Sequence, residues 1–236
     1  MDAILTTKSL SIGYNRTPLL SGIDINLRSG CLTILTGENG TGKSTLLKTF
    51  TKIIKPVSGE IYSQGREIET IPAKEFSKMV AVVLTDRLES ENFTAEEVIS
   101  FGRTPYTGFF GHLSQNDYSI IKGVAEQLRI TPLLSKNFYE LSDGQKQKVL
   151  IAKALAQQAE VIILDEPTAF LDFKAKDEIF ALLKNIATQN HIAILAATHD
   201  IYQAERYADE FWVMDGGTIP YLTVTKPSSV ITGSLS

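Results

Sequence analysis

A glycine-rich run at residues 37–44, with the sequence GENGTGKS, constrains this 236-residue chain more than any other segment. Directly before it lies an apolar stretch at residues 32–36, and after it residues 44–54 place apolar side chains at helical spacing. The pattern G-x-x-x-x-G-K-[ST] between a buried strand and a helix is typical of a loop whose backbone N–H groups wrap around phosphate. The run therefore predicts an α/β fold that binds a phosphorylated ligand.

Each residue type in this loop has a chemical reason. Glycines let the backbone approach phosphate oxygens closely, and the following helix adds the positive end of its dipole. Lys43 is expected to reach the β- and γ-phosphates of a nucleoside triphosphate, and the Ser44 hydroxyl to bind Mg²⁺. A merely flexible turn would not require a lysine and a serine at these positions. The predicted nucleotide-binding residues are Gly37, Glu38, Asn39, Gly40, Thr41, Gly42, Lys43, Ser44 and Thr45.

Two adjacent carboxylates, Asp165 and Glu166, follow a second apolar stretch at residues 161–164. In open α/β sheets, ligands gather at the carboxyl ends of the strands. Because neighbouring residues of a strand point to opposite faces, the two carboxylates are expected to have different roles. Asp165 is the predicted Mg²⁺ ligand, directly or through water. Glu166 is the candidate general base that polarises the attacking water.

Short apolar stretches alternate with helical patterns along much of the chain, which predicts a mostly parallel core sheet with right-handed crossovers. The first third reads as short strands, expected to include an N-terminal antiparallel β subdomain, whereas helical patterns dominate residues 94–158. We expect one domain, with a nucleotide-binding core at 1–93 and 159–222, an inserted α-helical subdomain at 94–158 and a loosely held tail at 223–236. The expected strands are 4–14, 23–27, 32–36, 60–63, 80–84, 161–164, 192–197 and 210–214. The expected helices are 44–54, 116–129, 142–157, 174–188 and 201–207. One more helix is expected to open at Thr94, which forms a capping-box pair with Glu97.

Composition narrows the classes of function. Hydrophobic residues make up 43% and charged residues 21%, which is ordinary for a globular protein. A net charge of −4 without a basic stripe argues against a nucleic-acid partner. The sequence has no stretch approaching the ~20 apolar residues that span a bilayer, so if a membrane is involved, another polypeptide must cross it. The single cysteine, Cys31, cannot form an internal disulfide, which fits a reducing compartment.

Two further motifs follow in a fixed order, LSDGQ at residues 141–145 and THD at residues 198–200. With GENGTGKST before them and VIILDEPT between them, the set resembles that of ATP-binding-cassette (ABC) ATPases, the P-loop NTPases of ABC transporters, and the resemblance covers residues 4–219. It implies that ATP and Mg²⁺ are the cofactors and that two identical subunits pack head to tail. Each ATP would lie between the glycine-rich loop of one subunit and the signature helix of the other. The signature residues are Ser142, Asp143, Gly144 and Gln145.

Three other positions match the family residue by residue. Tyr14 resembles the aromatic residue that stacks on adenine, a contact worth about 1–3 kcal/mol when fully formed. Taken alone, it would more often be a packed strand residue. His199, at a strand end, resembles the switch histidine that contacts the γ-phosphate and joins Lys43 and Glu166 as a catalytic residue. Asp172 lies in a loop that resembles the one communicating between the two ATP sites.

Two positions depart from the family pattern. The family expects a glutamine after the strand at residues 80–84, where this chain has Thr85 and Asp86; either residue is able to bind Mg²⁺ through oxygen. Asp143 replaces a signature glycine. An acid in the first turn of a helix gains about 0.3–1 kcal/mol, but a carboxylate about 8 Å from a γ-phosphate charge costs about 2 kcal/mol at an effective dielectric near 20. Repulsion is larger, so Asp143 is predicted to point away from ATP and activity to survive.

The helical block resembles one subgroup of the family. Its segments at residues 102–106 and 109–111 are similar to those of cassettes that import iron–siderophore, haem or cobalamin. The aromatic residues Tyr106, Phe109 and Phe110 either form an apolar patch that receives a permease or fill the core of the small subdomain. The resemblance implies a homodimer lying peripherally on the cytoplasmic side of the bacterial inner membrane. It would drive a transmembrane permease and be served indirectly by a substrate-binding protein.

Two alternative functions stay open at this point. One is a soluble ABC-type ATPase that acts in assembly or regulation without a permease. The other is a nucleotide-binding scaffold with little turnover, in which Glu166→Gln would cost no rate. The sequence does not identify the cargo, because in such importers the permease and the binding protein select it.

Overall fold

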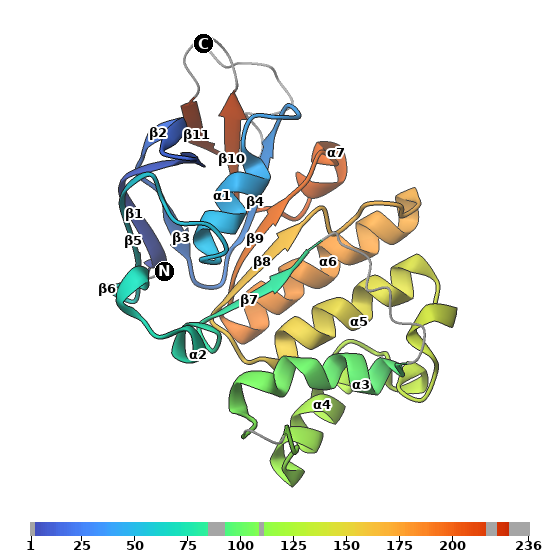
Figure 1. The fold of residues 1–236 in the computed structure, drawn as a ribbon. Helices are drawn as coiled ribbons and strands as arrows, with labels where there is room; N and C mark the ends of the chain where they lie inside the picture. The colour runs from blue at the N-terminus through green and yellow to red at the C-terminus, as the bar shows by residue number, and fades with distance from the viewer. Residues whose placement is uncertain (1–2, 85–92, 109–110, 216–220, 227–236) are drawn as a thin grey trace.

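The computed structural model describes residues 3–84, 93–108, 111–215 and 221–226, and for residues 221–223 it describes the backbone alone. Two sheets and a group of helices make up the fold (Figure 1). The strands are β1 (Ala3–Tyr14), β2 (Thr17–Ile23), β3 (Asn26–Arg28), β4 (Leu32–Gly37), β5 (Ser58–Ser63), β6 (Arg66–Glu67), β7 (Val80–Val83), β8 (Val161–Asp165), β9 (Ala193–Ala197), β10 (Glu210–Asp215) and β11 (Tyr221–Thr225). The helices are α1 (Lys43–Phe50), α2 (Ala73–Phe76), α3 (Ala95–Ser100), α4 (Gln115–Gln127), α5 (Asp143–Ala156), α6 (Phe173–Asn190) and α7 (Ile201–Ala204), with 3-10 turns η1 (Ile68–Thr70), η2 (Phe101–Tyr106), η3 (Thr131–Leu133) and η4 (Phe138–Glu140).

The larger sheet has six strands in the order β11-β10-β4-β9-β8-β7. From β10 to β7 all neighbouring strands pair in parallel, and only β11, at the edge, pairs antiparallel. Parallel neighbouring strands require crossover connections. Here the connections contain α5 and α6, which cover one face of the sheet (Figure 1). The predicted mostly parallel core sheet is confirmed.

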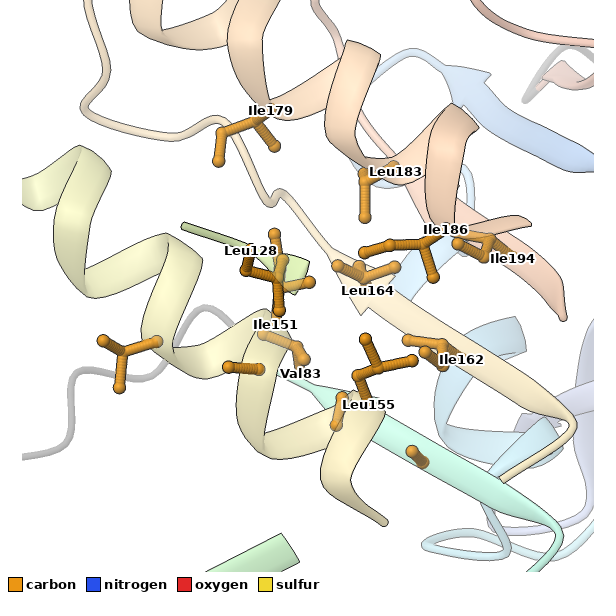
Figure 2. Packing of buried hydrophobic residues seen from close by; sticks show 14 of the residues in the cluster. Val83, Leu128, Ile151, Leu155, Ile162, Leu164, Ile179, Leu183, Ile186 and Ile194 are labelled. Carbon is orange, nitrogen blue, oxygen red and sulfur yellow. The ribbon is translucent and has the colours of Figure 1, made fainter. Parts of the chain in front are cut away.

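The parallel strands are apolar on both faces because helices cover both. In β8, Ile162 and Leu164 belong to one core cluster and Ile163 to the other. Figure 2 shows the first cluster, where Leu155 of α5 and Leu183 of α6 pack with the β8 side chains. The apolar side of α1 packs into the second cluster. Because α1 packs into one cluster and α5 and α6 into the other, the sheet lies between them. Each fully buried aliphatic side chain in these clusters stabilises the fold by about 1.5–3 kcal/mol.

The smaller sheet is antiparallel, with the order β2-β1-β5-β6 and β3 on β1, as expected. The expected strand at residues 23–27 is wrong at its centre, because β2 ends at Ile23 and β3 begins at Asn26. Thr7 of β1 gives the physical reason. Its hydroxyl donates to Ile23 O at 2.7 Å and accepts from Ile25 N at 3.0 Å. A side chain thus satisfies backbone groups where the chain crosses from one partner segment of β1 to the next.

The helical block begins each main helix with a capping box. Thr94, Ser114 and Ser142 are the N-caps of α3, α4 and α5, and each is paired reciprocally with the residue three positions later. Such boxes satisfy two backbone donors that a helix start otherwise leaves unpaired. The starts expected at Thr94 and Ser142 are confirmed. The helical block also shares its core cluster with one face of the large sheet, through residues such as Val98 and Ile121.

A buried ion pair ties the block together. Arg103 is 2% exposed, and its Nε lies 2.8 Å from Asp117 Oδ1, while its Nη1 donates to Ala156 O at 2.7 Å. The hydrogen bond from Ser114, followed by that from Arg103, lowers the pKa of Asp117 from 3.8 to about 2. Tyr106 stacks on the guanidinium, with 3.9 Å between its ring centroid and Arg103 Cζ, and remains 37% exposed. Breaking such a buried pair by removing one partner is strongly destabilising.

Three expected boundaries need correction. The helix expected at 44–54 ends at Phe50, because the backbone of Lys52 is left-handed with φ of 59° and its Nζ donates to Ile68 O and Ile71 O. The helix expected at 201–207 is the short α7, which gives way to a turn. The tail expected to be loosely held from residue 223 begins within β11, which pairs with β10. Residues 227–236 lie outside the described part.

The longest described helix, α6, spans 18 residues and has polar and charged side chains throughout its length. Within the described ranges, none of the helices combines the length and apolar character that crossing a membrane requires.

We predict that Gly102→Ala lowers the free energy of unfolding by about 1–3 kcal/mol, the usual cost of overpacking. A Cβ at Gly102 would lie 2.1 Å from the backbone oxygen of Lys153, so η2 would have to move away from α5. Gly123→Ala on α4 is the matched control, because a Cβ there meets open space. It is expected to stabilise by about 0.5–1 kcal/mol. Urea denaturation of both variants checks this, and equal effects would contradict the proposed close contact.

Candidate functional site

The carboxyl ends of β4, β8 and β9 meet at one edge of the large sheet. Asp165 pairs with Ala197 across β8 and β9, and Leu35 pairs with the same Ala197 across β4 and β9. The loops that leave these strands therefore start side by side. Glu166 N also donates to Ala197 O at 2.9 Å, which extends the ladder one residue beyond β8. This edge is where ligands bind in open α/β sheets.

The loop between β4 and α1 adopts backbone conformations that favour glycine. Gly37, Gly40 and Gly42 have φ of 149°, 84° and 105°. A Cβ at Gly37 would lie 2.2 Å from Met214 O, and one at Gly42 would lie 2.7 Å from Leu19 Cδ2. The loop thus packs closely on β10 at Gly37 and on β2 at Gly42, where a side chain would not fit without movement of its neighbours. Leu19 was missed in the sequence, because no strand was expected at β2.

Lys43 folds its ammonium group over this loop. Its Nζ donates to Gly37 O at 2.7 Å and to Glu38 O at 2.9 Å. Ser44 is exposed at the start of α1, whereas Thr45 is buried. The loop therefore presents a cation, a hydroxyl and the N-terminal N–H groups of α1 at one place. These residues fit an anionic phosphate group with a divalent cation.

Glu166 and His199 lie against each other at the same edge. Glu166 Oε2 is 3.0 Å from His199 Nδ1, and the side chains are 23% and 66% exposed. β8 ends at Asp165, and Glu166 has a left-handed backbone with φ of 48°. The two carboxylates were expected to point to opposite faces as neighbours within one strand. That reason is wrong, because β8 ends at Asp165 and Glu166 lies after it. A non-glycine residue in this conformation carries strain, which is common at active sites.

Tyr14 is the last residue of β1 and is 52% exposed. Thr45 Oγ1 donates to its hydroxyl at 3.4 Å. The ring thus stands beside the start of α1 with half of its surface open to solvent. An exposed aromatic face next to a phosphate-binding loop is suited to stacking on a planar base.

The signature residues lie on the other face of the sheet from α1, at the start of α5 (Figure 1). Ser142 N donates to Gln145 Oε1 at 3.1 Å, and Gln145 N donates to Ser142 Oγ at 3.3 Å. Asp143 is exposed. Together with Gly144 these residues line a cavity of about 400 Å³, and further lining residues come from α6 and from the segment before it.

Asp172 is the N-cap of α6, and its Oδ1 accepts from Ala175 N at 2.8 Å. It lines the same cavity as the signature residues. Phe170, two residues earlier, is 72% exposed and has a left-handed backbone with φ of 64°. The loop predicted for communication thus lies beside the signature rather than beside Lys43.

Four predicted residues lie outside the described residues: Thr85, Asp86, Phe109 and Phe110. The structure brings Lys43, Ser44, Asp165, Glu166 and His199 to one edge of the sheet.

Sequence reasoning missed a polar group that lies behind this edge. Asp200 received no role, although it accepts hydrogen bonds from Lys176 Nζ at 2.6 Å and from Thr168 Oγ1 at 2.7 Å. The available signal was its place in the THD motif, directly after His199. Lys176 gave no signal, because a lysine on a helix usually faces solvent.

The chain is similar to known proteins in both sequence and fold. The profile of the ABC transporter family matches residues 20–169, more than half of the chain. An uncharacterised ABC transporter ATP-binding protein of Methanocaldococcus jannaschii is 44% identical over 207 residues, which cover 88% of this chain and 71% of that protein. The iron(3+)-hydroxamate import ATP-binding protein of Bacillus subtilis is 34% identical over 215 residues, which cover 91% of this chain and 80% of that protein.

A solved structure shares the fold along nearly the whole chain. It is that of cbiO1 from Clostridium perfringens, part of the ABC transporter complex cbiONQ. It has a TM-score of 0.86 at 31% identity and covers 99% of this chain and 92% of that one. The sheet order, the glycine-rich loop and these matches lead to one conclusion. The chain belongs to the ABC transporter family, as one of its ATP-binding and ATP-hydrolysing proteins.

Proposed function

We propose that the chain is the ATPase subunit of an importer for an iron–siderophore or a related metal chelate. It would act through a separate transmembrane permease and, indirectly, with a substrate-binding protein. The meeting of Lys43, Glu166 and His199 at one sheet edge carries the ATPase part of this proposal. The name of the Bacillus subtilis relative, an iron(3+)-hydroxamate import protein, supports the cargo class.

The roles of the catalytic residues follow from their positions. Lys43 binds the β- and γ-phosphates, because its ammonium lies over the loop that surrounds them. Glu166 accepts a proton from the attacking water and orients it, since it directly follows β8, at the same edge of the sheet as the loop after β4. His199 contacts the γ-phosphate from the neighbouring loop and holds Glu166 in place through their 3.0 Å contact. Rate is gained by positioning and electrostatics, without a covalent enzyme intermediate.

Ser44 and Asp165 are the proposed ligands of Mg²⁺, with Thr85 or Asp86 as a further one. Hydroxyl and carboxylate oxygens are the ligands that this hard cation prefers. The ion supplies charge neutralisation for the phosphate oxygens. Ser44 lies at the start of α1, after the loop that leaves β4, and Asp165 is the last residue of β8; both strands pair with β9.

A second copy of the chain completes the site in this proposal. Ser142, Asp143, Gly144 and Gln145 open α5 on the face of the sheet opposite α1, so they are poorly placed to reach the phosphates of their own chain. In a head-to-tail homodimer the start of α5 instead faces the partner's glycine-rich loop, and its N–H groups bind the γ-phosphate. Asp172, beside the signature, links the two sites. Tyr14 stacks on the adenine.

The homodimer is proposed to lie on the cytoplasmic face of the membrane that holds the permease. A role in assembly or regulation without a permease is the second candidate. Purifying the tagged chain from gently solubilised membranes of its native host separates the two. We expect a polytopic membrane protein to accompany the chain and to change its ATPase rate. If the chain comes alone and membranes leave its rate unchanged, the transport proposal fails.

Glu166→Gln is expected to lower kcat for ATP by about 10²- to 10⁴-fold, the usual contribution of a general base. The Kd for ATP is expected to stay within a few-fold, because the substitution keeps the size of the side chain and leaves Lys43 untouched. Glu126→Gln, on the exposed side of α4, is the control and should keep the wild-type rate. Steady-state hydrolysis and ATP titration measure the two quantities. Full turnover by Glu166→Gln would favour a base other than Glu166 or a scaffold without this chemistry.

Asp143→Gly tests the orientation of the unusual signature residue. If Asp143 points away from ATP, as predicted, the variant binds ATP with less than about threefold change in KM, because the carboxylate then lies in water, where charges interact weakly. If its carboxylate faced the γ-phosphate, removing a repulsion of about 2 kcal/mol would tighten binding about 30-fold. Measuring KM for ATP at low ionic strength distinguishes the two results.

A further inference from the structure

A small network of polar side chains lies directly behind the contact between Glu166 and His199. Thr168 and Thr198 are fully buried, and the side chain of Asp200 is only 9% exposed. The charged partner comes from α6, where the side chain of Lys176 is 20% exposed. A carboxylate at this depth must be paired and hydrogen-bonded, so its partners fix where it lies.

The bonds of the network join three separate segments. Asp200 Oδ1 accepts from Lys176 Nζ at 2.6 Å, and Asp200 Oδ2 accepts from Thr168 Oγ1 at 2.7 Å. Asp200 N donates to Thr198 Oγ1 at 3.1 Å, and the two threonine hydroxyls lie 3.4 Å apart. The loop after β8, the loop after β9 and the first turns of α6 are thus held to one carboxylate.

Three residues of the network lie within two positions of Glu166 or His199 in the sequence. Thr168 lies two residues after Glu166, and Thr198 and Asp200 flank His199. The backbone alone does not favour this arrangement, because Glu166 is left-handed with φ of 48° and Asp200 has the unusual pair φ −81°, ψ 57°. Residues in sparsely populated conformations persist only where the surroundings over-determine them.

We propose that Asp200, held by Lys176 and Thr168, is a positioning residue that keeps His199 aligned with Glu166 for ATP hydrolysis. The inference rests on the proposed function, and it assigns roles to residues behind the site. None of the bonds described for the three residues reaches the glycine-rich loop, so the Kd for ATP is expected to depend on them much less than the rate of hydrolysis does. Lys176 lies one helical turn after Asp172, the N-cap of α6. The position of His199 is thus coupled, through Asp200 and Lys176, to the start of α6.

Lys176→Met is the main test, because it removes the charge and keeps most of the aliphatic length. We expect kcat to fall at least tenfold, since small displacements of catalytic groups cost one to two orders of magnitude. The Kd for ATP is expected to stay within about twofold, because the Lys43 cradle is untouched. Lys176→Arg restores a cation and should recover most of the rate.

The chain offers a matched control on the same helix. Lys184 lies further along α6 and pairs with Asp209, remote from the two catalytic loops. Lys184→Met therefore breaks a similar lysine–aspartate pair and should leave kcat unchanged. A melting temperature for each variant separates loss of fold from loss of alignment.

A double-mutant cycle shows whether Lys176 acts through His199. In a His199→Ala background, Lys176→Met should lower the residual rate by less than about twofold, because the residue it positions is gone. An additive loss in that background would overturn the inference, as would a wild-type kcat for Lys176→Met or an equal loss in Lys184→Met. Glu166→Gln is measured alongside. If it loses its rate while Lys176→Met does not, only the positioning role fails; if Glu166→Gln keeps its rate, the proposed function fails as well.

Discussion

Parallel pairing of β4, β8 and β9 is the constraint on which the site depends. Their side chains are buried on both faces, and a slip of one residue would exchange the two core clusters, so hydrophobic burial fixes the register. The register in turn fixes where the strands end, with Leu35 and Asp165 both opposite Ala197. Lys43, Glu166 and the loops that carry them come together because the sheet core holds their strands.

The same sheet also separates parts that the proposed reaction needs together. α1, with the glycine-rich loop, covers one face, and α5, with the signature, covers the other. Between the catalytic loops and the start of α6, the network around Asp200 replaces backbone pairing with side-chain bonds. The chain thus has a sheet edge held by the backbone ladder and, behind it, a junction held by side-chain hydrogen bonds. A second copy is proposed to bring the start of its α5 to the glycine-rich loop.

Local patterns account for what the sequence predicted well. The glycine-rich loop, the apolar runs of β4 and β8 and the capping box at Ser142 each depend on residues close in sequence, and the structure has all of them. Features that depend on distant residues were not predictable. The break between β2 and β3 arises from Thr7, which lies on another strand. The left-handed backbone of Glu166 and the pairing of Lys176 with Asp200 likewise require the assembled loops.

We propose that one chain holds only half of each reaction centre, because α1 and the start of α5 lie on opposite faces of the sheet. The most direct test measures the ATPase rate per chain while the protein is diluted, with sedimentation recording the fraction of dimer at each concentration. A site completed by a second copy predicts that the rate per chain falls in proportion to the dimer fraction, because a monomer lacks a signature for its own nucleotide. An undiminished rate per chain in samples that sediment only as monomers would contradict the account.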